Sequence, residues 1–392
     1  MDVRTVLYSF SGGDRSGITS RIFNALAEFD VTVLDVGQVV LRGRLTVGVL
    51  ITAPLEELEK SIRHRLTGLA SDLDLELFVQ SGEGDGTHAE VGVHLTLMGM
   101  PLRPQAVASI TQVISDLSGN IERIARVSDY PVVAIEFFVS GVEIDTIKAL
   151  LAPIAKENGV DIAVQPGGQA RHSKRLVMLD VDSTLIQNEV IELLADRAGS
   201  GEIVKAITTR AMNGEIDFAD ALRERVTTLA GLTQKDLEDV QHAIALTPGA
   251  RTLVDTLHHL GIHVGLVSGG FIEVVAPLAQ SLGIKFVRAN SLELIDGILT
   301  GRVVGPIIDR AAKADALREY AASLSIPLAQ TVAIGDGAND LDMIAAAGLG
   351  IAFNAKPVVA HAADAAISAP YLDSVLFLLG ITRQEITSYQ GV

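Results

Sequence analysis

The chain has 392 residues, about two to three times the usual length of a single domain, so more than one hydrophobic core is expected. Hydrophobic residues make up 48% and charged residues 20% of the sequence, which excludes an intrinsically disordered protein. The formal net charge of −17 opposes binding to nucleic acids or anionic lipids, and the absence of cysteine excludes disulfides and cysteine zinc sites. We therefore expect a globular protein that has neither a nucleic acid nor a membrane as its partner.

The N-terminus lacks the pattern of a secretory signal, because Met1-Asp2-Val3-Arg4 places an acid before the base and no long apolar stretch follows. The sequence also contains no uninterrupted run of about 18 apolar residues, the length that a membrane-spanning helix requires. These two observations predict a cytoplasmic protein.

Two consecutive segments, residues 1–81 and 90–166, show the same order of predicted elements: strand, helix, strand, strand, helix, strand. In the first segment we predict strands at 3–10, 31–40, 44–51 and 73–80, and helices at 16–29 and 54–69. In the second we predict strands at 91–98, 120–127, 132–139 and 160–165, and helices at 104–117 and 143–157. A glycine-rich linker at 82–86 separates them. The repeat predicts two small α+β domains of one fold.

A third domain is predicted at residues 174–392, where short apolar strands alternate with longer helices. The predicted strands are 176–180, 263–268, 286–289 and 331–335. Residues 190–245 are rich in helix and lack a convincing strand, so we expect them to form a helical cap over one end of the sheet. The fold class is therefore α/β, a Rossmann-like parallel sheet with a helical cap, preceded by two α+β domains.

The strongest chemical signal is a pair of carboxylates, Asp180 and Asp182, at the end of the first strand of this third domain. Because ligands bind at the carboxyl ends of strands in open parallel sheets, this pair can hold a divalent cation and act on a phosphate. The alternative is that Asp182 and Ser183 only cap the next helix.

Three further elements follow predicted strands in the same domain. Ser268-Gly269-Gly270 offers a hydroxyl and small residues that let backbone N–H groups approach an anion. Lys313 begins a predicted helix, and Asp336 lies among glycines in Gly335-Asp336-Gly337-Ala338-Asn339-Asp340. Each has an alternative as an ordinary turn, a solvated charge or a loop, but their joint order and placement predict one phosphate site.

These motifs resemble the four motifs of the haloacid dehalogenase-like phosphohydrolase superfamily over about residues 174–390. The resemblance implies a phosphatase in which Asp180 is the nucleophile and Asp182 is the general acid and base. It also implies that Asp180, the Asp182 backbone carbonyl and Asp336 hold Mg²⁺, while Ser268 and Lys313 hold the phosphoryl oxygens.

Within the superfamily the chain is similar to the phosphoserine phosphatase family. The resemblance rests on Glu189 beyond the first motif, Phe218 and Arg225 in segment 217–226, and Ser268-Gly269-Gly270-Phe271. It implies that phosphoserine is the substrate, that Arg225 binds its α-carboxylate and that Glu189 accepts from its α-ammonium. The other phosphate and substrate contacts implied are Phe218, Gly269, Gly270 and Asn339.

The N-terminal repeats resemble ACT domains, which commonly bind amino acids between copies. Gly13-Asp14-Arg15-Ser16-Gly17 is similar to the family's ligand loop, so Gly13, Asp14 and Gly17 are expected to bind a regulatory amino acid such as serine. The second repeat departs from the pattern with Gly99-Met100-Pro101-Leu102-Arg103-Pro104. The resemblance also implies a homodimer.

Two other functions remain open from the sequence. One is a phosphatase of the same superfamily that acts on another small phosphate ester, such as a sugar phosphate or phosphothreonine. The other is an inactive amino-acid sensor in which the two ACT-like repeats are the working part.

Overall fold

The computed structural model describes residues 4–52, 55–83, 92–168 and 173–390. The chain divides into two compact units, residues 1–89 and 90–392, and each is described by itself. The predicted linker at 82–86 lies partly outside the described residues. The first residues of the strands predicted at 3–10 and 91–98 and of the helix predicted at 54–69 also lie outside them. No helix in the described ranges is long and apolar enough to cross a membrane.

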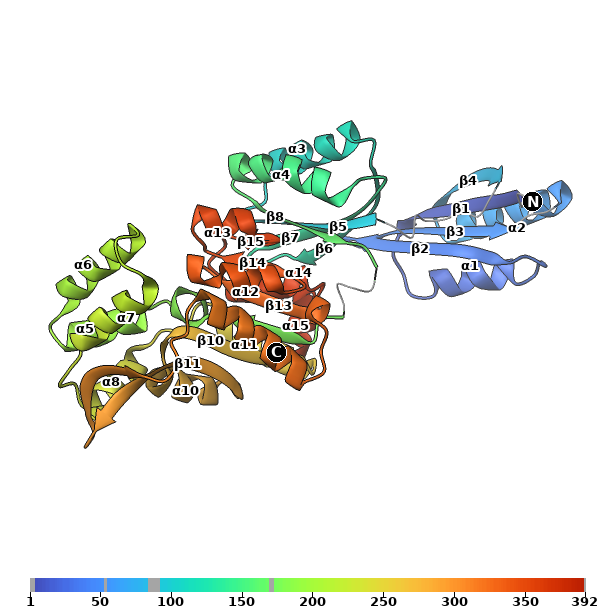
Figure 1. The fold of residues 1–392 in the computed structure, drawn as a ribbon. Helices are drawn as coiled ribbons and strands as arrows, with labels where there is room; N and C mark the ends of the chain where they lie inside the picture. The colour runs from blue at the N-terminus through green and yellow to red at the C-terminus, as the bar shows by residue number, and fades with distance from the viewer. Residues whose placement is uncertain (1–3, 53–54, 84–91, 169–172, 391–392) are drawn as a thin grey trace. The chain divides into compact units, whose positions relative to one another are not determined.

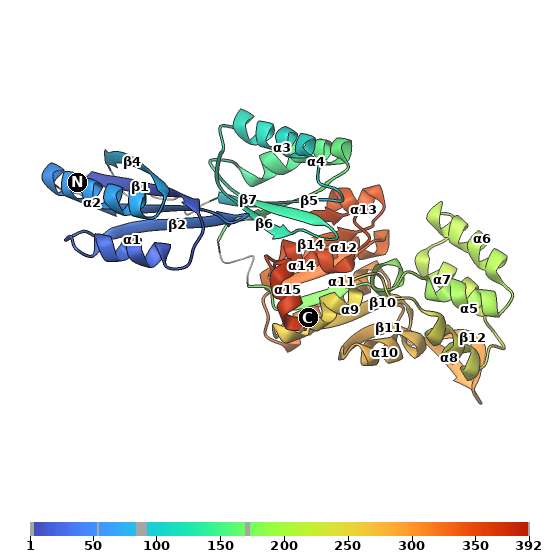
Figure 2. The same ribbon diagram turned by 180° about the vertical axis from the view of Figure 1, so that it is seen from behind.

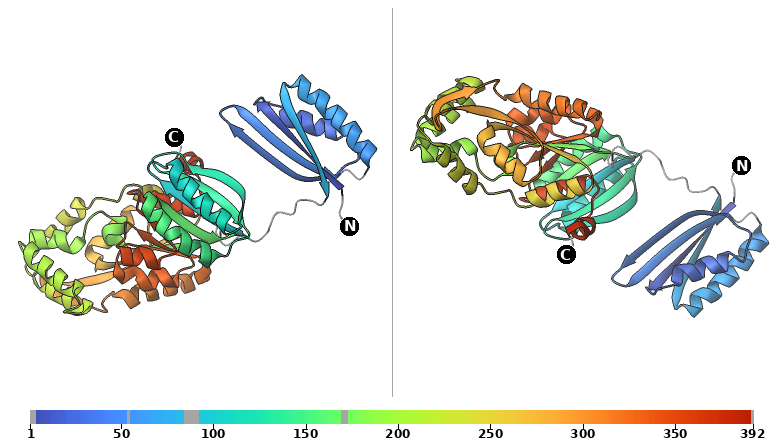
Figure 3. Two further views of the ribbon diagram at one scale, coloured as in Figure 1. Left: turned by 90° about the horizontal axis from the view of Figure 1, so that it is seen from above. Right: turned by 90° about the horizontal axis from the view of Figure 1, so that it is seen from below.

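The first unit is a four-stranded antiparallel sheet with the strand order β2-β3-β1-β4. Its elements are β1 (Arg4–Gly13), α1 (Ile18–Leu26), β2 (Val33–Leu41), β3 (Arg44–Thr52), α2 (Glu56–Asp72) and β4 (Leu75–Glu83). Residues of β1 alternate in burial, so Val6, Tyr8 and Phe10 face a core that both helices complete on one side of the sheet (Figure 3).

The second repeat has the same topology, with the strand order β8-β5-β7-β6. Its elements are β5 (Gly92–Gly99), α3 (Pro104–Asp116), β6 (Asn120–Ser128), β7 (Val133–Ser140), α4 (Ile144–Asn158) and β8 (Asp161–Pro166). Leu95 and Leu97 of β5 pack in a core with α3 and α4, whereas Met98 belongs to the core of the following domain. Both faces of this sheet are therefore covered.

The third domain is built on parallel strands in the order β10-β9-β13-β14-β15, with β11 beside β10 and β12 at the edge. Its strands are β9 (Leu176–Leu179), β10 (His263–Phe271), β11 (Phe286–Ile295), β12 (Ile298–Val304), β13 (Thr331–Gly335), β14 (Gly350–Phe353) and β15 (Ala365–Ile367). Its first helices are η1 (Val181–Leu185), α5 (Val190–Arg197), α6 (Gly201–Met212), α7 (Phe218–Thr227), α8 (Gln234–Ala243), α9 (Ala250–His259) and α10 (Ile272–Ser281). The later helices are α11 (Arg310–Ser323), η2 (Leu328–Gln330), η3 (Ala338–Asp340), α12 (Leu341–Ala346), α13 (Pro357–Ala362), η4 (Leu372–Ser374), α14 (Val375–Leu378) and α15 (Arg383–Gln390).

The sheet of the second repeat continues into that of the third domain. Ala163 of β8 pairs antiparallel with Ala365 of β15, which makes one sheet of 11 strands. Both ends of β15 are tied to the repeat: Lys148 Nζ donates to Asp364 at 3.1 Å, and Asp161 accepts from the Ser368 N–H and hydroxyl at 2.8 and 2.7 Å. The second repeat is thus an integral part of the unit that carries the predicted phosphate site.

Four helices, α5 to α8, form the region predicted as a cap (Figure 1). They are the only regular elements described between β9 and α9 apart from the turn η1. The antiparallel pair β11 and β12 extends beside them, and α7 packs against β12. At the C-terminal end, α15 packs against α9 (Figure 2).

Candidate active site

Asp180 lies directly after β9, in the middle of the parallel sheet, and is 3% exposed. The Lys313 ammonium, on the first turn of α11, donates to Asp180 Oδ1 and to Asp340 Oδ1 at 2.7 Å each. Lys313 and Asp340 are completely buried. Burial and the charge of Asp340 raise the pKa of Asp180, while the two carboxylates outweigh burial and raise the pKa of Lys313. One buried cation therefore holds two carboxylates in place.

Asp336 follows β13 and completes a cluster of three carboxylates. One oxygen from each of Asp180, Asp336 and Asp340 lies within 4.8 Å of the others. Asp336 Oδ1 accepts from the Thr184 hydroxyl at 3.2 Å, and burial, followed by the charge of Asp340, raises the pKa of Asp336 to about 6. Oxygen ligands at this spacing fit a small hard cation such as Mg²⁺, which would offset the repulsion between the carboxylates.

Asp182 has different partners from Asp180. Its Oδ1 accepts from the Val190 N–H at 2.7 Å and its Oδ2 accepts from the Ser268 hydroxyl at 2.9 Å. The backbone stays extended at Asp182 and turns at Ser183, whose φ is 58°. Burial raises the pKa of Asp182, which favours the protonated form. Asp182 therefore combines a helix-capping bond with a contact to the predicted phosphate loop.

The predicted phosphate loop, Ser268-Gly269-Gly270, lies at the end of β10. The Ser268 hydroxyl oxygen accepts from the Gly270 N–H at 2.7 Å. A Cβ on Gly270 would lie 2.9 Å from Asp182 Oδ2 and 3.0 Å from Ser268 Oγ, closer than side chains approach. A larger residue at position 270 would therefore displace the Asp182 carboxylate or the Ser268 hydroxyl. A Cβ on Gly269 would meet Phe218 Cζ at 3.6 Å and Asn339 Nδ2 at 3.9 Å, so both predicted substrate contacts lie beside this loop.

Glu189 and Arg225 bring opposite charges to the cap side of the site. Glu189 accepts from the Ser183 hydroxyl at 2.7 Å. Partial removal from water, followed by the charge of Asp182, raises the pKa of Glu189 to about 7. Burial lowers the pKa of Arg225, which lies within the electrostatic influence of Glu189 and Asp182. The hydrogen bond described for the Arg225 guanidinium is donated by Nε to Ala221 O at 3.3 Å.

The structure adds Asp340 and Thr184 to the residues that the sequence predicted. Asp340 belongs to the carboxylate cluster, and its Oδ2 also accepts from the Gly337 N–H at 3.0 Å. Its signal in the sequence was a second carboxylate four residues after Asp336. Thr184 is the last residue of the motif that begins at Asp180. A single threonine does not indicate a hydrogen bond to Asp336, which lies 152 residues further along the chain.

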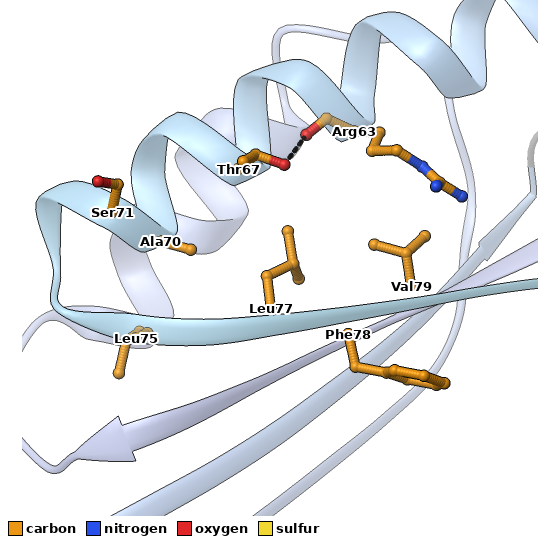
Figure 4. Close-up of a pocket in the computed structure, with 8 residues that line it drawn as sticks. All are labelled: Arg63, Thr67, Ala70, Ser71, Leu75, Leu77, Phe78 and Val79. Atoms are coloured by element: carbon orange, nitrogen blue, oxygen red, sulfur yellow. Dashed lines mark hydrogen bonds between the residues drawn. The ribbon is translucent and has the colours of Figure 1, made fainter.

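The loop predicted to bind a regulatory ligand joins β1 to α1 in the first unit. Gly13, Asp14 and Gly17 are all exposed, and Gly17, with φ of 89°, is the N-cap of α1. A groove of about 520 Å³ lies elsewhere in this unit, between α2 and β4, and its lining includes Arg63, Thr67, Leu77 and Val79 (Figure 4). The predicted loop does not line this groove.

Comparison with known families agrees with this organisation. ACT domains match residues 4–80 and 87–165, and haloacid dehalogenase-like hydrolases match residues 177–345. The fold and the site thus define a haloacid dehalogenase-like hydrolase that carries two ACT domains, which confirms the predicted fold class.

Relatives extend over nearly the whole chain. The phosphoserine phosphatase of Streptomyces coelicolor is 51% identical and covers 98% of this chain and 94% of its own length. The phosphoserine phosphatase SerB2 of Mycobacterium tuberculosis is 47% identical, with coverages of 97% and 94%. A solved phospho-aspartyl intermediate analogue of phosphoserine phosphatase is 41% identical with a TM-score of 0.50, and covers 52% of this chain and 98% of that one. The chain belongs to the phosphoserine phosphatase family, and the predicted enzyme class is confirmed.

Proposed function

We propose that this chain hydrolyses O-phosphoserine to serine and phosphate through an aspartyl-phosphate on Asp180. The observation that carries the proposal is the arrangement of buried Asp180 and Lys313 with half-buried Asp182, in which nucleophile, cation and acid converge at one end of the sheet. The solved relative described as a phospho-aspartyl intermediate analogue supports the same chemistry.

Asp180, the Asp182 backbone carbonyl and Asp336 would hold Mg²⁺, and Asp340 lies close enough to assist. When bound, the ion supplies positive charge that offsets the charge of the phosphate monoester. Lys313, which donates to Asp180 Oδ1, supplies a second positive charge. The Ser268 hydroxyl and the N–H groups of its loop would donate hydrogen bonds to the phosphoryl oxygens.

In the first half of the reaction, an Asp180 carboxylate oxygen attacks phosphorus in line with the serine oxygen. The P–O bond to serine breaks, and protonated Asp182 gives its proton to the leaving alkoxide. In the second half, the Asp182 carboxylate takes a proton from the water that attacks phosphorus, which releases phosphate and regenerates Asp180. The raised pKa of Asp182 suits the first of these two roles.

Substrate choice would come from the cap side. Arg225 can receive the α-carboxylate in a bidentate contact, and Glu189 can accept from the α-ammonium. Phe218, beside Gly269, would exclude water when the cap closes over the substrate. A sugar phosphate offers neither of the charges that these two side chains match.

The test is phosphate release from phosphoserine with Mg²⁺, compared with phosphothreonine, a sugar phosphate and an aryl phosphate. We expect phosphoserine to have the highest kcat/KM and Asp180→Asn to abolish turnover while the chain stays folded. Higher turnover of a sugar phosphate would favour another phosphatase of the superfamily, and a folded wild-type chain without turnover of any ester would favour the amino-acid sensor.

We further propose that serine regulates the enzyme at the first ACT domain. The loop of Gly13, Asp14 and Gly17 is exposed at the N-terminus of α1, where free N–H groups can receive a carboxylate and Asp14 can receive an ammonium. A Cβ on Gly13 meets no atom within 4 Å, so Gly13→Val changes the loop surface without a clash.

Serine is also a reaction product and can inhibit by binding at the catalytic site. The pattern of inhibition therefore distinguishes that site from a regulatory site in the loop. We expect a non-competitive component in the wild type that is lost in Gly13→Val and Asp14→Ala and kept in the control Asp30→Ala, whose exposed carboxylate lies outside the loop. Competitive inhibition of equal strength in all four chains would refute a regulatory site in this loop.

A homodimer is also proposed, through β2. All nine residues of this edge strand are exposed, among them Val36, Val39 and Leu41 at 44, 53 and 72%. Replacing Val39 and Leu41 with lysine should convert the dimer to a monomer in sedimentation analysis. A wild-type chain that sediments as a monomer would refute this proposal.

A further inference from the structure

We infer that Asn290 is a positioning residue that fixes the direction in which the Ser268 hydroxyl donates its proton. The inference rests on the proposed phosphatase function and adds a residue that does not itself touch the phosphate. Asn290 lies on β11, opposite Phe271 of β10 in the parallel register, and is completely buried.

The Asn290 side chain uses both of its polar atoms. Its Nδ2 donates to Gly269 O at 2.8 Å, and its Oδ1 accepts from the Ile308 N–H at 2.8 Å. Ile308 precedes Asp309, the N-cap of α11, whose first turn carries Lys313. One buried amide therefore joins the phosphate loop to the segment that leads into the lysine helix.

The Gly269 carbonyl and the Gly270 N–H belong to the same peptide plane. Asn290 holds the carbonyl end of this plane, and the N–H at the other end donates to Ser268 Oγ at 2.7 Å. Because a planar trans peptide points these two groups in opposite directions, fixing one end fixes the other. Asn290 thereby keeps the Gly270 N–H directed at Ser268 Oγ.

The hydrogen bond from the Gly270 N–H determines the direction in which the Ser268 hydroxyl donates its own proton. With one lone pair taken by the Gly270 N–H, the hydroxyl proton points away from that group, toward Asp182 Oδ2 at 2.9 Å. The same direction serves a phosphoryl oxygen that enters beside Asp182. If the peptide plane flipped, the Gly269 carbonyl would face the hydroxyl and draw its proton away from the substrate.

Only a side chain with a donor and an acceptor at this spacing can fill the position. Asn290→Leu keeps the approximate volume and removes both bonds, and we expect it to lower kcat about 10- to 100-fold, with a smaller change in KM. A neutral carboxylic acid has the same donor and acceptor as the amide, whereas a carboxylate would repel the Gly269 carbonyl. We therefore expect the kcat of Asn290→Asp, relative to wild type, to rise as the pH falls, while the ratio for Asn290→Leu stays flat.

The decisive experiment is a double-mutant cycle of Asn290→Leu and Ser268→Ala in the full chain, with phosphoserine and an aryl phosphate as substrates. If Asn290 acts through Ser268, Asn290→Leu should cost less than about 3-fold in kcat/KM once the hydroxyl is gone. Gln165→Met is the matched control, since it removes another buried amide bond, to Leu378 O at 2.8 Å, and should leave kcat unchanged.

Additive losses in the cycle would overturn the inference, as would an Asn290→Asp ratio that falls with falling pH. If Asn290→Leu does not fold, the role of Asn290 is tested by the pH dependence of the kcat of Asn290→Asp relative to wild type. A wild-type chain that hydrolyses the aryl ester but not phosphoserine would refute the proposed substrate, while the cycle measured on the aryl ester would still decide the role of Asn290.

Discussion

Arg225→Ala should separate recognition of the serine moiety from phosphoryl transfer. Arg225 lies on α7 of the cap, and its guanidinium makes one long described hydrogen bond, 3.3 Å to Ala221 O, so little protein structure depends on it. A bidentate, charge-assisted contact with the α-carboxylate in a closed site contributes about 1.5–3 kcal/mol, or about 10- to 150-fold in kcat/KM. The proposed carboxylate contact thus predicts a loss that is large and specific to the substrate.

The assay compares phosphoserine with O-phosphoethanolamine, which keeps the ammonium and lacks the carboxylate. We expect Arg225→Ala to lose about 10- to 150-fold in kcat/KM on phosphoserine and less than about 3-fold on phosphoethanolamine. Arg223→Ala is the control on the same helix, because Arg223 is exposed and pairs with Asp220 at 2.9 Å. Equal losses of Arg225→Ala on both substrates would refute the carboxylate contact and indicate a role in cap closure.

Asp182→Asn should lower kcat on phosphoserine by about 10²–10⁴-fold, because both proton transfers lose their group, and a near-normal kcat would contradict the acid–base role. The pKa of Glu189, raised to about 7, makes its carboxylate more abundant as the pH rises, so the KM for phosphoserine should fall from about pH 6 to about pH 8. An ester without an ammonium should show no such fall, and Glu189→Gln should remove it. Asp161→Ala should lower the free energy of unfolding of the second unit by about 1–3 kcal/mol in urea, while exposed Asp129→Ala should not.

The sequence predicted the elements that depend on local pattern. The strand predicted at 331–335 coincides with β13, and the alternating repeats predicted both ACT domains because period-two burial and turn residues act over short distances. β14 and β15 were not predicted, because they are short and acquire their structure from pairing with β13 and β8. β12 was also not predicted, and it is held in place by antiparallel pairing with β11.

The residues of the site also fall into two groups, those that a local motif predicts and those that become recognisable only in the folded structure. Asp180, Asp182, Ser268, Lys313 and Asp336 could be predicted because each follows a strand or begins a helix in a recognisable motif. Asn290 could not, because a single asparagine inside a strand acquires its importance only when the fold brings Gly269 and Ile308 to its two polar atoms. Long-range hydrogen bonds of this kind leave no periodic trace in the sequence.

One sheet runs through both the second repeat and the catalytic domain. The two repeats therefore differ in how easily each could be exchanged for another domain. The first repeat forms its own unit and could be replaced by another domain without opening any strand pairing of the second. The second repeat covers β15, a short strand of Ala365, Ala366 and Ile367, whose free edge would invite pairing with other chains. Chimeras that join a foreign domain to this catalytic domain should therefore keep residues 92–168, since a junction placed after them would expose the edge of β15 and promote aggregation.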